Sequence, residues 1–279
     1  MPYVALFIWL AMCLLLGGVM HHILRVAFTY RLVGALAAPG LVVRKLAMIV
    51  AALLTGATVT QVNLYDLKDR DIGFDADGIS ITARVLVPLV PLFACAMALQ
   101  IVNAMLGRPV DLAYEPPALS SLDAGGAGGF LLGMWGLMSQ LVRQVAQADW
   151  GSLKLYALLG FLFSLSLGAC VRFGKFHDAI LGVTLLALGL AALSALFGLA
   201  PGSGSAPGGG SVARLASSLR AGVMTTSGTA VVMMLGGLLA AILVSTAARV
   251  LEMVGLATGG KKGENAAGSG ERPQRRRAA

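Results

Sequence analysis

Long runs of apolar residues, separated by short polar stretches, fill most of the 279-residue chain. A helix needs about 20 consecutive apolar residues to cross the hydrocarbon core of a bilayer. The runs that reach or approach this length lie at 3–25, 33–57, 81–106, 125–145, 153–171, 180–199 and 223–254. The pattern therefore predicts an all-α membrane protein, a polytopic helical bundle of about six or seven transmembrane helices.

Two segments interrupt the apolar pattern, and a basic tail follows the last apolar run. Residues 58–81 are polar and acidic, and their alternation of apolar and polar positions, with an Asp77-Gly78 pair, predicts a short β-hairpin after the second helix. Residues 201–220 are rich in Gly, Ser and Pro, which is typical of a flexible linker. We therefore expect the following organisation: a membrane-helical core over 1–200, the linker over 201–220, a final transmembrane helix over 221–256 and a disordered basic tail over 257–279.

Composition supports the membrane assignment. Hydrophobic residues make up 57% of the chain and charged residues only 12%. A soluble globular domain carries about 25% charged residues, so this share is half of what such a domain needs on its surface. The composition excludes a soluble enzyme, a secreted disulfide scaffold and a disordered protein.

The basic residues of the tail indicate its side of the membrane and a lipid partner. The net charge of +8 is concentrated in the tail, where Lys and Arg outnumber Glu. Basic residues close to a membrane helix remain on the cytoplasmic side and attract anionic lipid. We therefore expect a cytoplasmic C-terminal tail in contact with anionic lipid, and we do not expect nucleic-acid binding.

Prolines lie inside two of the apolar runs. Pro39 is followed by Gly40, and the third run contains Pro88 and Pro91. A proline removes a backbone donor and its ring clashes with the preceding turn of a helix. We expect these residues to kink or break the helices that contain them.

Residues 38–64 (APGLVVRKLAMIVAALLTGATVTQVNL) form the most informative segment. Pro39-Gly40 opens a helix, 51–57 has the sequence AALLTGA, and 59–64 supplies a short strand. The segment resembles the active-site helix of intramembrane zinc metalloproteases of the site-2 protease type. In prokaryotic members of that family a Pro-Gly leads into a helix with an H-E-x-x-H motif. The resemblance implies a multi-pass protein of the bacterial cell membrane.

The catalytic positions of that helix are occupied by other residues here. Arg44 stands where the family has its first histidine, Lys45 replaces the general-base glutamate, and Met48 replaces the second histidine. Cationic side chains repel a zinc ion, and a lysine is a poor general base without a metal-bound water to activate. The resemblance therefore implies a degenerate, non-catalytic relative that has lost the zinc cofactor, and we expect no metal.

Three further residues are candidates for remnants of the former site. Asp178 lies between two predicted spans, where related proteins are expected to place an aspartate that completes the zinc site, and His177 is next to it. Asp123, in an LDAGG segment, is similar to the family's L-D-G element. One interpretation pairs Arg44 or Lys45 with Asp178 where the metal once was. The alternative is that Pro39 shortens the helix, so that both cations reach the interface.

The sequence leaves three functions open. The first is a catalytically dead homologue that binds a membrane-protein partner or membrane segment without cleaving it. The second is a small transporter or channel-like protein, because proline-broken spans and intramembrane charges are common at transport sites. The third is an active protease with unorthodox ligands such as His177, Asp178 and Asp123. The replaced catalytic positions favour the first.

Overall fold

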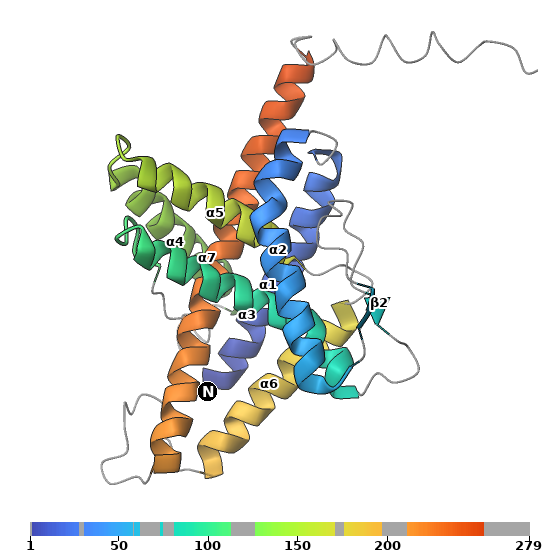
Figure 1. The fold of residues 1–279 in the computed structure, drawn as a ribbon. Helices are drawn as coiled ribbons and strands as arrows, with labels where there is room; N and C mark the ends of the chain where they lie inside the picture. Colours follow the sequence, from blue (N-terminus) through green and yellow to red (C-terminus); the bar gives the residue numbers. More distant parts are fainter. Residues whose placement is uncertain are drawn as a thin grey trace, which may run out of the picture.

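A computed structural model describes residues 2–27, 31–57, 59–61, 73–74, 81–112, 126–170, 176–196 and 211–253. This part of the chain is almost entirely helical (Figure 1). The elements are, in order, α1 (Pro2–Ala27), α2 (Arg31–Thr55), β1 (Val59–Gln61), β2 (Gly73–Phe74), α3 (Ile81–Met105), α4 (Gly126–Gln147), α5 (Leu153–Ala169), α6 (Phe176–Leu196) and α7 (Ser211–Met253).

Five of these helices are long and apolar enough to cross a membrane, which makes the chain a multi-pass membrane protein. The candidate spans are Tyr3–Ile23, Ala37–Thr55, Val87–Met105, Phe176–Leu196 and Arg214–Ala247. The sequence predicted six or seven spans, and the structure reduces this number. The two helices that fall short are α4, whose last turns carry Gln140, Arg143 and Gln144, and α5, which has only 17 residues.

Helix α5 forms the centre of the fold. Its C-terminal half is buried without interruption from Leu162 to Ala169, and α2, α3 and α7 all pack against it. A helix that is apolar on every side lies in a protein core or spans a membrane. The C-terminal half of α5 is enclosed by its neighbours, whereas Leu153, Lys154 and Tyr156 at its start are exposed. The sequence predicted α5 to be a span of its own.

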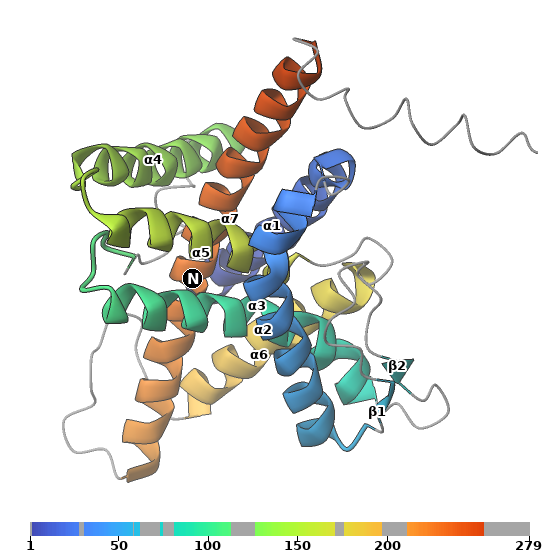
Figure 2. The same ribbon diagram turned by 45° about the horizontal axis from the view of Figure 1, so that its top comes forward.

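The longest helix, α7, extends through most of the described molecule (Figures 1 and 2). Its 43 residues correspond to about 65 Å at 1.5 Å per residue. Helices α3, α4 and α5 cross α7 instead of lying along it (Figure 2). α7 begins at Ser211, before the position 221 expected for the final helix, because 211–220 contains no Pro or Gly to delay it. Residues 201–210 and the tail 257–279 lie outside the described residues.

The prolines do not interrupt their helices as predicted. α2 begins at Arg31 and continues through Pro39, so Pro39-Gly40 does not open the helix. α3 likewise contains both Pro88 and Pro91 within one helix. Neighbouring helices and hydroxyl side chains can take over the backbone groups that a proline frees, and α5 does so at Gly40, as described below.

The polar segment after α2 is described only in part. β1 pairs antiparallel with β2, with Val59 opposite Phe74 and Gln61 opposite Gly73. Residues 62–72 and 75–80 lie outside the described part of the chain. The turn and the outer ends of the hairpin expected near 58–81 therefore stay a prediction. At the end of α2, Gly56 has φ +71°, and the Ala57 N–H donates to the Ala52 carbonyl at 2.9 Å. This left-handed glycine ends the helix and directs the chain toward β1.

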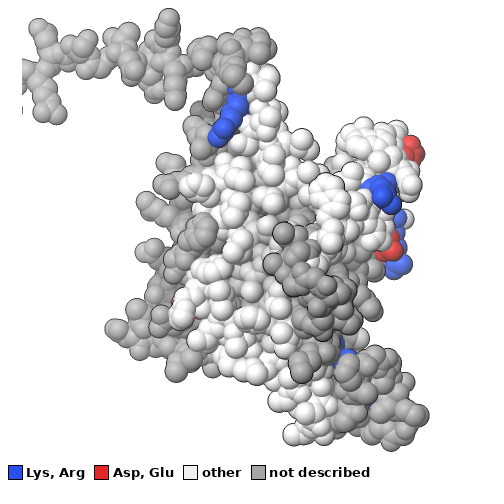
Figure 3. All heavy atoms as spheres, turned by 180° about the vertical axis from the view of Figure 1, so that it is seen from behind, with Lys and Arg blue, Asp and Glu red and all other residues white. Residues whose placement is uncertain are grey.

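Charged side chains are sparse on the face shown in Figure 3, and apart from a basic group near the C-terminal end of α7 most of them gather along one side of it. They lie over the α4–α5 connection and the turn after α3. The exposed charged residues of these two segments and of the adjoining ends of α4 and α5 are Arg108, Asp111, Arg143, Asp149 and Lys154. This side of the described part is therefore suited to water or lipid headgroups.

Candidate functional site

The candidate site is built where α2 crosses α5 at very short range. A Cβ added to Gly40 would overlap the backbone carbonyl of Ser164, and one added to Gly168 would overlap the carbonyl of Gly40. Only residues without a side chain allow two helix backbones to approach this closely. The glycines therefore fix the position of α2 against the end of α5.

A hydrogen bond accompanies this close approach. Pro39 has no N–H, and its ring disturbs the hydrogen bonding of the turn that contains it. The N–H of Gly40 donates to Ser164 Oγ across the helix interface, at 2.8 Å. The Ser164 hydroxyl thus satisfies a buried backbone donor and joins α2 to α5.

We expect a Ser164→Ala variant to be less stable by about 1–3 kcal/mol, because the buried Gly40 N–H loses its acceptor. A Ser152→Ala variant is the control, since the Ser152 side chain makes no capping hydrogen bond at the start of α5. Thermal unfolding of both variants in the same detergent measures the difference. Equal midpoints for the two variants would contradict a structural role for the Gly40–Ser164 hydrogen bond.

One helical turn further along α2, two consecutive cations are buried. Arg44 is 9% exposed and Lys45 is 5% exposed, although both lie inside the candidate span Ala37–Thr55. Pro39 does not shorten α2, which continues through it, so that part of the interface interpretation is wrong. Charged groups at this depth are costly unless they are hydrogen-bonded or paired.

Arg44 is held by the end of α5. Its Nη1 donates to the backbone carbonyl of Cys170 at 2.7 Å. Cys170 caps α5 and has extended backbone angles, with φ −61° and ψ 128°. Its carbonyl lies at the negative end of the helix, where cations are stabilised. Arg44 also lies near Cys95 on α3. The guanidinium therefore lies between α2, α3 and α5.

Met48, which stands at the position of the second histidine of the H-E-x-x-H motif, is part of an apolar cluster. Met48 is buried against Ala51 and Val87, with Ile49 and Val90 at its edge. This cluster joins α2 to the proline-containing half of α3. A thioether packed among aliphatic side chains fills space and offers little to a zinc ion.

The other predicted residues have different surroundings. Asp178 is half-buried in the first turn of α6, and His177 beside it is exposed. Residues 171–175, which lie between Cys170 and α6, are outside the described residues, and so is Asp123. Within the described ranges, no group of three or more His, Cys, Asp or Glu side chains is arranged to hold a metal ion.

Sequence reasoning identified the cations but missed what holds them. Ser164, Gly168 and Cys170 belong to an apolar run that looks like an ordinary span. The small residues of α5, which include Ser164, Ser166 and Gly168, are a signal of close helix packing. That signal shows a potential interface, but it does not identify α2 as the partner.

No family model, curated protein or solved structure matches the chain.

Proposed function

We propose that this chain is a non-catalytic, site-2-protease-like membrane protein that binds a membrane segment or a membrane-protein partner. The observation that carries the proposal is the burial of Arg44 and Lys45 inside a candidate span, with Arg44 bound to the Cys170 carbonyl. In the resembled family these positions present a histidine and the general-base glutamate. Here they carry two cations that form part of the core.

The chemistry of these positions supports a binding role over hydrolysis. A zinc protease needs neutral or anionic ligands and a base beside a metal-bound water. Arg44 and Lys45 add positive charge at this point, and Met48 lies in an apolar cluster. In this proposal, α2 is similar to the active-site helix of the protease family but lacks side chains that could bind the metal or activate water.

Metal analysis tests this proposal. We expect the purified chain to hold less than stoichiometric zinc. A triple variant, Arg44→His with Lys45→Glu and Met48→His, places two imidazoles at i and i+4 on one helix face. We expect it to bind zinc in stoichiometric amounts, with Asp178 as the third ligand. Adding Asp178→Ala to the triple variant should then abolish binding, because a catalytic zinc site needs three protein ligands.

The control is a single Met48→His variant, which supplies one imidazole and should bind no zinc. Circular dichroism and elution volume establish that each variant is folded. Stoichiometric zinc in the native chain, lost in His177→Ala or Asp178→Ala, would contradict the proposal and indicate an active site with unorthodox ligands.

A transporter is the alternative, and one observation favours it. Buried ionisable residues in a span often mark the path of a substrate or ion, and both Arg44 and Lys45 are of this kind. Proline-containing helices such as α2 and α3 are also common at such sites. Ion or solute flux into proteoliposomes that disappears in Lys45→Met would favour the transporter. An absence of flux in native proteoliposomes would favour the binding protein.

A further inference from the structure

Three helix ends lie on one side of the molecule. α3 and α4 end there and α5 begins there, and the three helices run in roughly the same direction in both ribbon views (Figures 1 and 2). The candidate span of α3 ends at Met105, where this side begins. We call this side the elbow end and define it as residues 106–112 after α3 and residues 143–156 around the α4–α5 connection.

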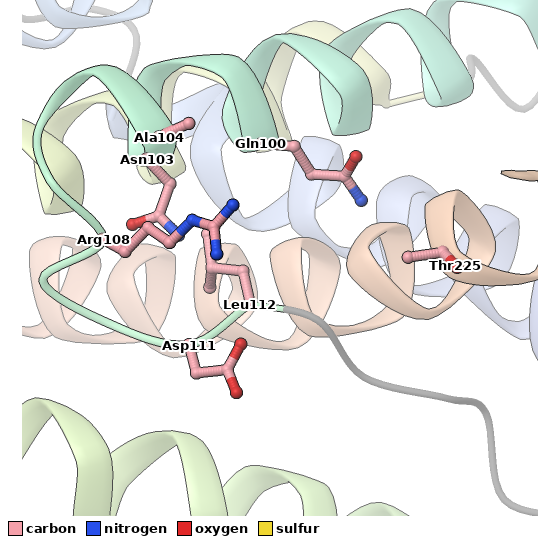
Figure 4. A pocket seen from close by; sticks show the side chains of 7 residues that line it. All are labelled: Gln100, Asn103, Ala104, Arg108, Asp111, Leu112 and Thr225. Atoms are coloured by element: carbon pink, nitrogen blue, oxygen red, sulfur yellow. The ribbon is translucent and has the colours of Figure 1, made fainter.

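The elbow end carries a concentration of charge. Its exposed charged residues are Arg108, Asp111, Arg143, Asp149 and Lys154. Figure 4 shows Arg108 and Asp111 on the turn that follows α3, beside a cavity of about 230 Å³. The Asp149 carboxylate accepts a hydrogen bond from the Gly151 N–H at 3.0 Å, so it shapes the α4–α5 turn. Charge that begins where an apolar span ends is typical of the place where a helix leaves the hydrocarbon core.

Two aromatic rings accompany these charges. Trp150 is 49% exposed and Tyr156 is 52% exposed, and their rings meet edge to face at 6.1 Å. The Trp150 indole N–H donates to the Ala146 carbonyl at 3.4 Å, which keeps the ring beside the end of α4. Leu153, between the two aromatic residues, is 83% exposed. Tryptophan and tyrosine combine an apolar ring with a polar tip and are enriched where a membrane meets water.

Along α4, the exposed side chains change from apolar to polar toward the elbow end. Leu132 and Trp135 in the first half of the helix are each 72% exposed, although α4 packs against α7. The exposed residues of its last two turns include Gln140, Arg143 and Gln147. A helix with this gradient is suited to enter a bilayer from its polar end, because its large apolar side chains then contact lipid and its polar ones contact headgroups or water.

The length of α4 fits this placement. Trp135 lies twelve residues before Gln147, which corresponds to about 18 Å at 1.5 Å per residue. Half of the hydrocarbon core of a bilayer is roughly 15 Å thick. With the elbow end at the headgroup level, Trp135 therefore lies deep among the acyl chains.

We infer that the elbow end is embedded in the headgroup layer of a lipid bilayer, with α4 and α5 extending from it into the hydrocarbon core. Arg143 and Lys154 pair with lipid phosphates, and the Trp150 and Tyr156 rings lie at the boundary with the acyl chains. Interfacial aromatic and basic residues of this kind set the tilt of membrane helices. This contact with lipid does not depend on what the α2–α5 site binds.

Depth-dependent fluorescence quenching tests the inference. The full chain is reconstituted in phosphatidylcholine vesicles that carry a nitroxide-labelled lipid, with the label either on the headgroup or deep in the acyl chain. The difference between the native chain and Trp150→Phe gives the signal of Trp150, and Trp135→Phe gives that of Trp135. We expect the headgroup label to quench Trp150 more strongly than the acyl-chain label does, and the reverse for Trp135.

A charge reversal tests the contact with phosphate. Lys154 is exposed, so Lys154→Glu should fold as the native chain does, which circular dichroism and elution volume establish. We expect Trp150 to lose part of its quenching by the headgroup label, because a carboxylate is repelled by lipid phosphates. The matched control is Arg249→Glu, at an exposed cation near the end of α7, away from the elbow end (Figure 1). It should leave the quenching of Trp150 unchanged.

Three results would overturn the inference. Trp150 that neither label quenches would place the elbow end in water or under another protein. Stronger quenching of Trp150 by the acyl-chain label would place it inside the hydrocarbon core. Quenching of Trp135 mainly by the headgroup label would show that α4 lies flat on the bilayer surface.

Discussion

A Gly40→Ala variant should lose roughly 3 kcal/mol or more of stability, even though alanine is the better helix former. The added methyl group would overlap the carbonyl carbon and oxygen of Ser164, which belong to a helix backbone and cannot rotate away. Helices α2 and α5 would have to separate, which would weaken the Gly40–Ser164 and Arg44–Cys170 hydrogen bonds. Thermal unfolding in detergent and the yield of monodisperse protein measure the loss.

Gly160→Ala is the matched control for this experiment. Gly160 lies on α5 as well, but a Cβ added there meets nothing within 4 Å. The same substitution should therefore stabilise the chain by up to about 1 kcal/mol through helix propensity. If the two alanine variants unfold at the same temperature, α2 and α5 do not cross as described.

Asp178→Ala should destabilise the chain by about 3–5 kcal/mol if Asp178 balances the buried charge of Arg44, because it would leave an uncompensated cation in the core. Combining it with Arg44→Met, which removes that cation and keeps a long side chain, should restore much of the loss. A double-mutant cycle on unfolding free energies measures the coupling between the two residues.

His177→Ala is the control for the cycle, since His177 is adjacent to Asp178 but exposed. We expect it to cost little and to show no coupling with Arg44→Met. Independent, additive effects of Asp178→Ala and Arg44→Met would contradict the pairing.

The resemblance and the structure give different information about α2. The resemblance rests on residues 38–64 and assigns to Arg44, Lys45 and Met48 the positions of lost catalytic groups. The structure adds that both cations are buried and that Met48 packs in an apolar cluster. The family relationship itself stays a prediction, which the zinc-binding triple variant addresses directly.

The sequence by itself determined the class of this protein and the approximate position of each helix that the structure describes. Apolar runs of this length can satisfy their backbone groups in a bilayer only by forming helices, so composition and run length are sufficient for that conclusion. Helix ends were less well determined. The prolines suggested boundaries that the structure does not have, since α2 continues through Pro39 and α3 continues through Pro88 and Pro91.

Only the tertiary structure decided which helix forms the core and which backbone carbonyl binds Arg44. Gly40 and Ser164 are 124 positions apart, and Arg44 and Cys170 are 126 positions apart. Contacts over such distances leave no periodic signal in the chain, because helical periodicity reports only which residues share a face. α5 looked like one more span in the sequence. Its small residues and the glycine opposite them on α2 make it the buried centre, because helix backbones approach closely only where side chains are absent.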